Sequence, residues 1–273
     1  MIWRTSRRTL DLGRRGLLMG ILNVTPDSFT DGGCFYDTDA AVDHGMRMAR
    51  EGAALIDVGG ESTRPGAAPV TLGEELRRVI PVIEALRSKT DIPLSIDTSK
   101  AAVARAAIGA GAEIINDITA LSGDPAMAAL AAETGVGVVL MHMRGNPQTM
   151  QQKTSYSNII PEIAGHLAER TQAAMTAGIA GDCIAIDPGI GFAKTAEQNW
   201  ALIDGLTAFT AMGRPVVLGV SRKSFLKSVA GDDIPRRDEE TARLTARGFA
   251  LGARIFRVHE IPKNLAALRA AEI

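Results

Sequence analysis

The sequence predicts an α/β fold, a (β/α)8 TIM barrel, with a single domain over residues 1–273. Two observations support this prediction. Short, near-continuous apolar runs alternate with longer amphipathic segments, and eight such pairs fit within the 273 residues. Apolar runs of this kind are typical of parallel strands buried on both faces, and eight βα units in about 250 residues are typical of one barrel. A doubly wound open sheet is the alternative, but no Gly-x-Gly-x-x-Gly segment follows the first run.

The expected strands are apolar runs that end at polar or Gly-rich loops. They cover residues 17–22, 54–58, 93–97, 113–116, 136–141, 183–187, 215–219 and 254–258. The expected helices carry apolar residues three or four positions apart, as Leu72, Leu76, Val79 and Ile83 do. They cover residues 39–51, 71–89, 101–110, 125–134, 159–177, 196–206, 239–251 and 262–271. Pro81 predicts a kink or a break in the second helix. Residues 9–12 are a candidate strand of a short N-terminal β-hairpin.

Charge and composition argue against several classes of partner. The net charge is −1, so no global basic field favours nucleic acid or an anionic membrane. No apolar run reaches the ~20 residues that span a bilayer, and the arginines near the start precede no long apolar run, so no secretory signal is expected. Cys34 and Cys183 lie far apart without metal-ligand spacing. We expect a free thiol and a buried apolar residue, respectively, in a cytoplasmic protein.

A polar residue stands at or just past the end of each expected strand. In a parallel barrel these ends emerge on one face, where barrel enzymes keep their sites. The loop 187–192 shows the pattern clearly, because an apolar run stops at Asp187 and Pro and Gly residues follow. The strand-end set comprises Asn23, Glu61, Thr63, Arg64, Asp97, Asn116, His142, Asp187, Lys223, Arg257 and His259.

Several members of this set also have a structural alternative. Asp97 and Asn116 are candidate helix N-caps, and Asp187 is a candidate brace for its own Gly-rich turn. Lys223 is either a solvated loop charge or a Schiff-base lysine of the kind that barrel aldolases place at a strand end. His142 is more typical of a packed histidine than of a metal ligand, because no cluster has zinc spacing.

Taken together, the set suits a ligand with two chemically different ends. Two carboxylates and the amide of Asn116 match a flat heterocycle with an amidine-like edge, and Lys223 supplies a donor for a ring carbonyl or nitrogen. Arg64, Arg257 and His259 form a cationic group matched to phosphate oxygens. The neutral oxygen of Asn23 is a candidate ligand of Mg²⁺. We call the space that these strand ends surround the bowl. It therefore fits a heteroaromatic ring at one end and a diphosphate at the other.

These residues lie in segments that resemble the signature segments of the dihydropteroate synthase family. The segments are Gly20-Ile-Leu-Asn-Val-Thr-Pro-Asp-Ser-Phe29, Gly60-Glu-Ser-Thr-Arg-Pro-Gly66, Ser95-Ile-Asp-Thr-Ser-Lys100, Ile115-Asn-Asp-Ile118, Asp187-Pro-Gly-Ile-Gly-Phe192, Ser221-Arg-Lys-Ser224 and Arg257-Val-His259. They occur in the family order and cover nearly the whole chain. Departures are small: Ala101 stands where Pro is common, and Ala193 where Gly is common.

The resemblance implies a reaction and a role for each site residue. 6-Hydroxymethyl-7,8-dihydropterin diphosphate would condense with 4-aminobenzoate to give 7,8-dihydropteroate and diphosphate, in folate biosynthesis. The implied pterin ligands are Asp97, Asn116, Met141, Asp187 and Lys223. The implied diphosphate ligands are Asn23, Arg64, Arg257 and His259, and Asn23 would also bind Mg²⁺. The implied 4-aminobenzoate pocket, where sulfonamides compete in this family, comprises Thr63, Pro65, Phe192 and Ser224. Catalysis would rest on Asp97, Lys223 and Arg257, with Asp31.

The family mechanism is dissociative and needs no protein nucleophile. Diphosphate leaves first, a pterin methylene cation remains near the carboxylates, and the arylamine attacks it. The loops 23–33 and 59–66 are expected to close over the substrates, with Asp31 helping to order them. The family also implies a homodimer.

Three rival functions remain open from the sequence. A methyltetrahydrofolate:corrinoid methyltransferase would keep counterparts of Asp97, Asn116 and Asp187, but it would have little use for the loop 23–33 or for the pair of Arg257 and His259. A pterin-binding paralogue without activity would be expected to lack one or more polar site residues, and none is missing. A Schiff-base aldolase on Lys223 is possible on fold grounds alone.

Overall fold

The computed structural model describes residues 1–25 and 38–272. Asp31, Cys34 and most of the loop 23–33 lie outside the described residues, so the expectations for them are not addressed by the structure. Among the described residues, no helix is both long and apolar enough to cross a membrane.

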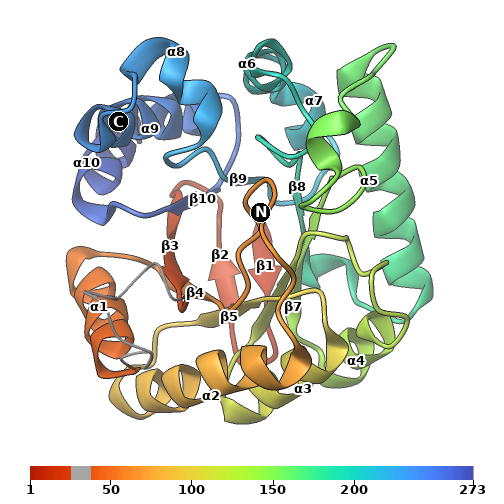
Figure 1. Cartoon of the computed structure of the whole chain (residues 1–273), viewed down its shortest axis with the longest axis vertical. Coiled ribbons are helices and arrows are strands. Elements are labelled where there is room, and N and C mark those ends of the chain that lie inside the picture. The colour runs from red at the N-terminus through yellow and green to blue at the C-terminus, as the bar shows by residue number, and fades with distance from the viewer. Residues whose placement is uncertain (26–37, 273) are drawn as a thin grey trace.

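Eight parallel strands form the central sheet, in the order β8-β7-β6-β5-β4-β3-β10-β9 (Figure 1). They are β3 (Leu17–Asn23), β4 (Leu55–Gly59), β5 (Leu94–Asp97), β6 (Ile114–Asp117), β7 (Gly137–Met141), β8 (Ile184–Asp187), β9 (Val217–Leu218) and β10 (Ile255–Val258). A parallel bridge between Ile186 and Val216 joins the two ends of this order, and the Ile186 N–H donates to the Pro215 carbonyl at 2.9 Å. The sheet therefore closes into the predicted barrel.

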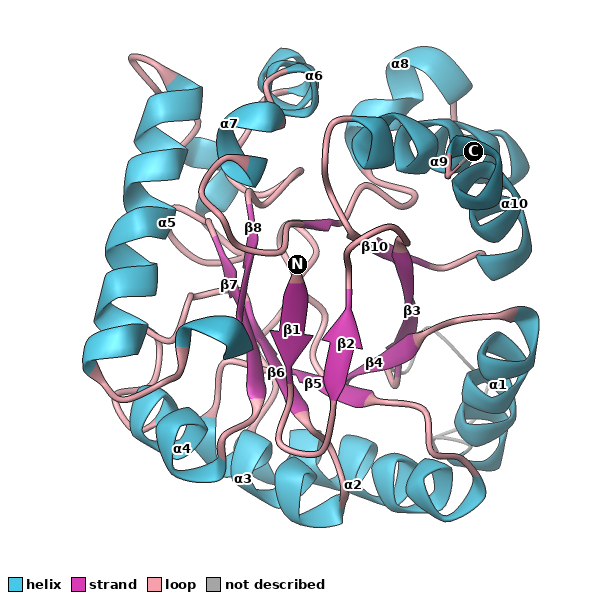
Figure 2. Cartoon of the chain, turned by 180° about the vertical axis from the view of Figure 1, so that it is seen from behind, coloured by secondary structure: helices cyan, strands magenta, loops and turns pink. Residues whose placement is uncertain are grey.

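Helices surround the barrel, in agreement with the predicted βα alternation (Figures 1 and 2). They are α1 (Thr38–Glu51), α2 (Leu72–Lys89), α3 (Ala101–Ala110), α4 (Met127–Thr134), α5 (Ile159–Thr176), α6 (Ala196–Asp204), α7 (Thr207–Thr210), α8 (Lys227–Ala230), α9 (Ile234–Ala250) and α10 (Ile261–Ala271), with short 3-10 helices η2 (Met150–Gln152), η3 (Gly181–Cys183) and η4 (Ser224–Leu226).

Two helices differ from their predicted form. Helix α2 continues through Pro81 without a break, because its buried face, including Val79, Val82 and Ile83, is held against the barrel and compensates for the lost backbone hydrogen bond. Helix α9 begins at Ile234 rather than at residue 239, since the Asp233 side chain accepts a hydrogen bond from the Arg236 N–H and so caps an earlier start.

An apolar layer fills the inside of the barrel. Trp3 and Leu12 pack there against one residue from each of seven strands. Those seven residues are Met19, Leu55, Ile114, Val139, Ala185, Val217 and Ile255. A barrel interior packed in layers is a core and not a pore, so ligands have access only to the open end above this layer.

The expected N-terminal hairpin is present and lies across the other end of the barrel (Figure 2). It pairs β1 (Ile2–Arg4) with β2 (Thr9–Asp11) in antiparallel fashion. Trp3 is fully buried, and its Nε1 donates to the Cys183 carbonyl at 2.9 Å. Cys183 is itself buried, as expected, and its thiol is free. The hairpin therefore covers the N-terminal ends of the strands.

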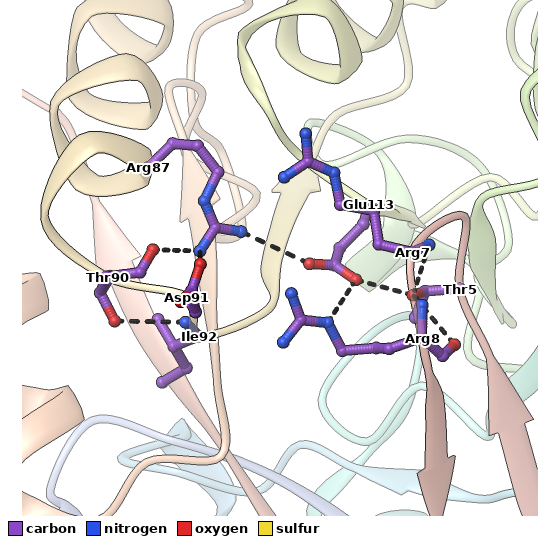
Figure 3. Close-up of polar contacts among 8 residues, drawn as sticks. All are labelled: Thr5, Arg7, Arg8, Arg87, Thr90, Asp91, Ile92 and Glu113. Carbon is purple, nitrogen blue, oxygen red and sulfur yellow. Dashed lines mark hydrogen bonds and ion pairs between the residues drawn. The ribbon is translucent and has the colours of Figure 1, made fainter.

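A buried carboxylate anchors the turn of this hairpin (Figure 3). Glu113, just before β6, is fully buried. Its Oε2 accepts hydrogen bonds from Thr5 Oγ1 at 2.7 Å and from Arg8 Nε at 3.0 Å. Its Oε1 lies 3.5 Å from Nη1 of Arg87, which comes from the end of α2. Two arginines from different elements thus face one buried carboxylate at the bottom of the barrel.

Candidate active site

The candidate site shares the inner face of the barrel with the apolar layer. Along a strand, every second side chain points to the same face. Asp187 lies two residues after Ala185, and Arg257 lies two residues after Ile255. Four more residues lie two positions after a residue of the apolar layer on their own strand: Asp57, Asn116, Met141 and Gly219. Polar side chains therefore stand directly above the core, at the C-terminal ends of the strands.

The register of the strands makes the predicted residues neighbours around the ring. Asn23 is paired with Gly59, Gly59 with Asp97, and Asp97 with Asn116. On the other side of the barrel, Met141 is paired with Asp187. Residues that are separated by tens of positions in the sequence thus meet at one level.

Arg257 and Asp57 are the centre of a buried polar network. The Arg257 Nε donates to Asp57 Oδ2 at 2.6 Å, and its Nη2 donates to Asp97 Oδ2 at 2.7 Å. The same Asp57 oxygen accepts a hydrogen bond from Asn116 Nδ2 at 2.9 Å. The side chain of Asp57 is fully buried, and that of Arg257 is 19% exposed. Although burial lowers the pKa of Arg257, Asp57 and Asp97 raise it above its usual value, so the guanidinium stays charged.

The two predicted carboxylates of the bowl hold protons more tightly than free carboxylates. Burial raises the pKa of Asp97 to about 7, although Arg257 opposes this; Asp57 raises it further. Burial also raises the pKa of Asp187, against the opposing charge of Lys223 and the hydrogen bond that the Gly189 N–H donates at 2.7 Å. Carboxylates in such surroundings are typical of sites that recognise a ligand rather than of solvated surface.

Lys223 comes from the loop after β9 and reaches into the bowl. Burial lowers its pKa to about 8, while Asp187 opposes the shift. Its ammonium donates to the carbonyl of Ile190 and lies 4.6 Å from the centre of the Phe192 ring. The preceding Arg222 holds this loop, since it makes a two-fold ion pair with Asp238 of α9 at 2.7 and 2.8 Å.

Two glycines leave room in the bowl. A Cβ at Gly219 would lie 3.7 Å from Asp187 Oδ2 and 3.9 Å from Lys223 Nζ. A Cβ at Gly59 would lie 3.6 Å from Asp97 Oδ2 and 3.8 Å from Asn23 Oδ1. Their missing side chains open the space between the polar groups, as a site for a flat ring requires.

The loop after β8 is fixed through its carbonyl groups. Lys223 donates to the carbonyl of Ile190, Gln151 Nε2 to that of Gly191 at 3.1 Å, Lys194 Nζ to that of Phe192 at 2.7 Å, and Tyr156 Oη to that of Ala193 at 3.1 Å. Lys194 is 3% exposed, and its Nζ also lies 3.1 Å from His142 Nδ1. The half-buried ring of Phe192 is therefore held at a defined position beside Lys223.

The remaining predicted residues lie at the rim. Thr63 is half-buried, whereas Arg64, Pro65 and Ser224 are exposed. A pocket of about 220 Å³ opens between Thr63 and Asp97, with Thr98, Thr119 and Asn146 among its lining residues.

His259 differs from its expected cationic role. Its Nδ1 lies 2.9 Å from Ser221 Oγ. Burial lowers the pKa of His259 to about 3, and the charges of Arg222, Arg257 and Arg64 lower it further. It is therefore neutral at physiological pH and offers hydrogen bonding instead of charge.

The described residues fit magnesium only in a limited way. They contain no group of three or more His, Cys, Asp or Glu side chains that would hold a metal ion. Asn23 contributes one amide oxygen at the end of β3. Mg²⁺ usually keeps several waters and is bound by few protein oxygens together with substrate phosphates. The donor set thus fits an ion that a diphosphate brings with it.

Sequence reasoning missed two buried residues of the site. Asp57 was overlooked because it lies inside an apolar run, although its position two residues after Leu55 marks it as inward-facing. Lys194 was overlooked because a loop lysine normally reaches solvent. Glu61 forms an ion pair with Lys100 and lines the same pocket as Thr63 and Asp97. His142 is packed, as expected, and burial lowers its pKa to about 2.

Comparison with known families gives the class of this barrel. A family model described as "Pterin binding enzyme" matches residues 19–259, from β3 to the end of the β10 segment. The match includes all the strand-end residues described above. The chain therefore belongs to the family of pterin-binding enzymes.

The relatives narrow this class to dihydropteroate synthases. A dihydropteroate synthase of Synechocystis sp. is 46% identical over 252 residues, which is 92% of this chain and 87% of the relative. The Yersinia pestis dihydropteroate synthase, solved in complex with a sulfonamide drug, superposes with a TM-score of 0.93 at 42% identity and covers 100% of this chain and 98% of its own. That of Xanthomonas albilineans, solved with 4-aminobenzoic acid, gives 0.92 at 43% identity, covering 98% and 96%. Within the pterin-binding enzymes, the chain is thus a member of the dihydropteroate synthase family.

Proposed function

We propose that this chain is a transferase that condenses 6-hydroxymethyl-7,8-dihydropterin diphosphate with 4-aminobenzoate, giving 7,8-dihydropteroate and diphosphate in folate biosynthesis. The observation that carries the proposal is the ring of Asp97, Asn116, Asp187 and Lys223 around space left by Gly59 and Gly219, in a chain 46% identical to a dihydropteroate synthase. The solved relatives with a sulfonamide and with 4-aminobenzoic acid support small-molecule substrates of this kind.

The pterin ring would occupy the centre of the bowl. Asp187 and Asp97 accept hydrogen bonds from ring N–H groups, and the amide of Asn116 hydrogen-bonds to another edge of the pterin ring. Lys223, whose pKa of about 8 leaves it largely protonated at pH 7, donates to the ring carbonyl or a ring nitrogen. Met141 lies at the same level as Asp187 and packs against the ring. Because all these polar groups are buried, a ring that fails to pair with them is rejected strongly.

The diphosphate would lie towards the rim, near Asn23, Arg64, Arg257 and His259. Arg257 Nη1 makes no hydrogen bond within the described part of the chain, since Nε and Nη2 face the two carboxylates. It is therefore suited to meet a phosphate oxygen. The neutral ring of His259 donates a hydrogen bond. Mg²⁺, held on the protein side by Asn23, would neutralise charge on the departing diphosphate.

The bond-breaking step needs electrostatic stabilisation and not a nucleophile. Departure of the diphosphate leaves a positive charge on the pterin methylene group, and Asp97 and Asp187 stabilise that charge. The arylamine of 4-aminobenzoate then attacks the methylene carbon. Thr63, Pro65, Phe192 and Ser224 would line its pocket, and the fixed position of Phe192 supports this assignment. Asp31 and the loop 23–33 complete the catalytic set in this proposal.

The proposal also covers the domain organisation, the oligomeric state and the cellular location of the protein. We infer a single domain over residues 1–273, a homodimer of such chains, and a cytoplasmic location where the folate precursors are made. The closed ring of eight strands supports the single domain, and Cys183 as a free buried thiol is in keeping with a reducing compartment.

Product formation is the direct test. The protein is mixed with Mg²⁺, the dihydropterin diphosphate and 4-aminobenzoate, and dihydropteroate is measured by mass spectrometry with and without Mg²⁺. Product that needs both substrates and is suppressed by a sulfonamide supports the proposal. Tight pterin binding without product would favour a binding-only paralogue or a methyltransferase, and a borohydride-trapped adduct on Lys223 would favour an aldolase. Light scattering separates a dimer from a monomer.

A further inference from the structure

Asp57 stands out among the buried groups that the proposed reaction does not use. It lies in the middle of β4, fully buried, and its Oδ2 accepts hydrogen bonds from both Arg257 and Asn116. Its Oδ1 is also buried and has no hydrogen-bond partner among the described residues. An unpaired buried carboxylate oxygen is costly, so it calls for a functional reason.

The hydrogen bonds to Asp57 fix the orientation of the two side chains that donate them, Asn116 and Arg257. Because Asn116 Nδ2 gives one hydrogen to Asp57, the amide is fixed in one of its two orientations and its Oδ1 is left for another partner. Because Arg257 Nε also faces Asp57 while Nη2 faces Asp97, the planar guanidinium is held at two points and Nη1 is left for a ligand. One side chain thus orients a pterin-facing amide and a diphosphate-facing arginine.

The charge of Asp57 also changes the balance of the bowl. Asp57, Asp97 and Asp187 face the cations Arg257 and Lys223. Lys194 also acts on Asp187, but burial lowers its pKa well below the usual value, so it is left out of the charge count. When all five groups are ionised, one carboxylate is in excess, which favours a positive charge on a ligand. Without Asp57 the same groups would balance, and Arg257 would be held by Asp97 alone.

We propose that Asp57 is a positioning residue of the active site, which orients Asn116 and Arg257 and supplies the excess carboxylate beside the reacting methylene group. The proposal rests on the proposed function, because it assigns Asp57 to the pterin diphosphate half of that reaction and not to the arylamine half.

The main test is Asp57→Asn, which keeps the shape and one acceptor oxygen but removes the charge. We expect kcat/KM for the pterin diphosphate to fall about tenfold or more, and about a hundredfold in Asp57→Ala, with KM for 4-aminobenzoate within about threefold of the parent value. If Asp57→Asn yields no folded protein, Asp57→Ser carries the same test. A KM for 4-aminobenzoate that rises as much as kcat/KM for the pterin diphosphate falls, or parent-like kinetics, would overturn the proposal.

A matched control is Asp117→Asn on β6, which is separated from β4 by β5. Asp117 is equally buried, but its carboxylate accepts hydrogen bonds from the N–H groups of Thr119 at 2.8 Å and Leu121 at 3.0 Å, in the turn after β6. This substitution should lower stability to denaturant and leave kcat/KM for the pterin diphosphate within about threefold. If it affects kinetics as Asp57→Asn does, loss of any buried carboxylate nearby explains the effect, and the inference is wrong.

The pH profile gives a second readout, in which Asp57→Asn is compared with Asp117→Asn, because both carboxylates raise the pKa of Asp97 and Asp57 raises it more. Asp97 is faced by Arg257 of β10, Asp57 of β4, Glu75 of α2 and Asp117 of β6, and its pKa is about 7. Removing the Asp57 charge removes one cause that raises this pKa. The acid limb of kcat/KM in Asp57→Asn should therefore shift to lower pH, and an unshifted limb would contradict the inference.

Failure of the proposed function can be recognised separately. If the parent protein makes no dihydropteroate, that function is wrong, and calorimetry with 6-hydroxymethyl-7,8-dihydropterin then decides the role of Asp57. Binding by the parent that is about tenfold weaker in Asp57→Asn would still support positioning of Asn116. Equal binding by both would exclude it.

Discussion

Glu113 and Asp187 are buried carboxylates at opposite ends of one barrel, and their surroundings differ. Glu113, at the N-terminal ends of the strands, receives hydrogen bonds from Thr5 and Arg8 and faces Arg87 (Figure 3). Asp187, at the C-terminal ends, receives one hydrogen bond, from the Gly189 N–H to Oδ1, and its Oδ2 accepts none within the described residues. Glu113 is held by two hydrogen bonds and two arginines of the protein, although its Oε1 makes an ion pair and no hydrogen bond. Asp187, in contrast, keeps acceptor capacity for a ligand.

The backbone shows the same contrast. Four described residues other than glycine have positive φ, and all lie in loops that follow β6, β8 or β9, on the side of the bowl; they are Ala120, Leu121, Ala193 and Arg222. At the other end, helices finish in glycines such as Gly111 and Gly135, which adopt these angles without strain. Strained backbone gathers where ligands would bind, so one end of the barrel is organised for stability and the other for recognition.

The largest effect should follow from Asp187→Asn at the open end. The variant keeps an oxygen for the Gly189 N–H but presents a donor to ring N–H groups, so two charge-assisted hydrogen bonds are lost at about 1.5–3 kcal/mol each. We expect pterin affinity to fall by a hundredfold or more by titration calorimetry, with little change in thermal unfolding. Near-normal affinity would contradict the assignment of Asp187 to the pterin.

The opposite outcome is expected from Glu113→Ala at the closed end. The substitution leaves Arg8 and Arg87 without their buried partner, and breaking such a pair costs about 3–5 kcal/mol. Urea unfolding should show this loss, while kcat/KM of the protein that remains folded should match the parent. A change in kinetics with unchanged stability would reverse the comparison between the two ends.

The pH dependence of pterin binding tests the charges of the bowl. Asp97 must be ionised to accept ring N–H groups, and Lys223 must be protonated to donate. With pKa values of about 7 and about 8, kcat/KM should be highest between these values and should fall about tenfold per pH unit beyond each limb. In Lys223→Ala, turnover should fall and the alkaline limb should vanish. A limb that persists belongs to another group.

The smallest effect is expected at Ala193, which has φ 53° and a buried methyl group. Ala193→Gly relieves about 1–2 kcal/mol of strain, but it also removes a buried methyl worth about 0.8 kcal/mol and makes the unfolded chain more flexible. The free energy of unfolding should therefore change by less than about 1 kcal/mol. Ala193→Val should destabilise far more, because a β-branched residue rarely adopts this backbone conformation.

The fold and most of the bowl were predictable from the sequence because they depend on local patterns. Apolar runs with polar ends located all eight strands and brought Asp97, Asn116 and Asp187 to one face. The network of Asp57 was not predictable in the same way. That Arg257 turns back to two carboxylates, and that His259 is neutral, depend on packing and burial across strands, which residue spacing does not encode. The start of α9 depended on the cap at Asp233.

The hydrogen bond between Trp3 and Cys183 has a consequence for the order in which the chain is assembled on the ribosome. The two residues are 180 positions apart, and Thr5 and Glu113 are 108 positions apart. Trp3 is therefore synthesised long before Cys183, and its indole N–H has no access to this carbonyl until then. Contacts of such long range carry a large loop-closure cost, which slows folding. The hairpin is thus made early, but its hydrogen bond to Cys183 becomes available only when about two-thirds of the chain has been synthesised.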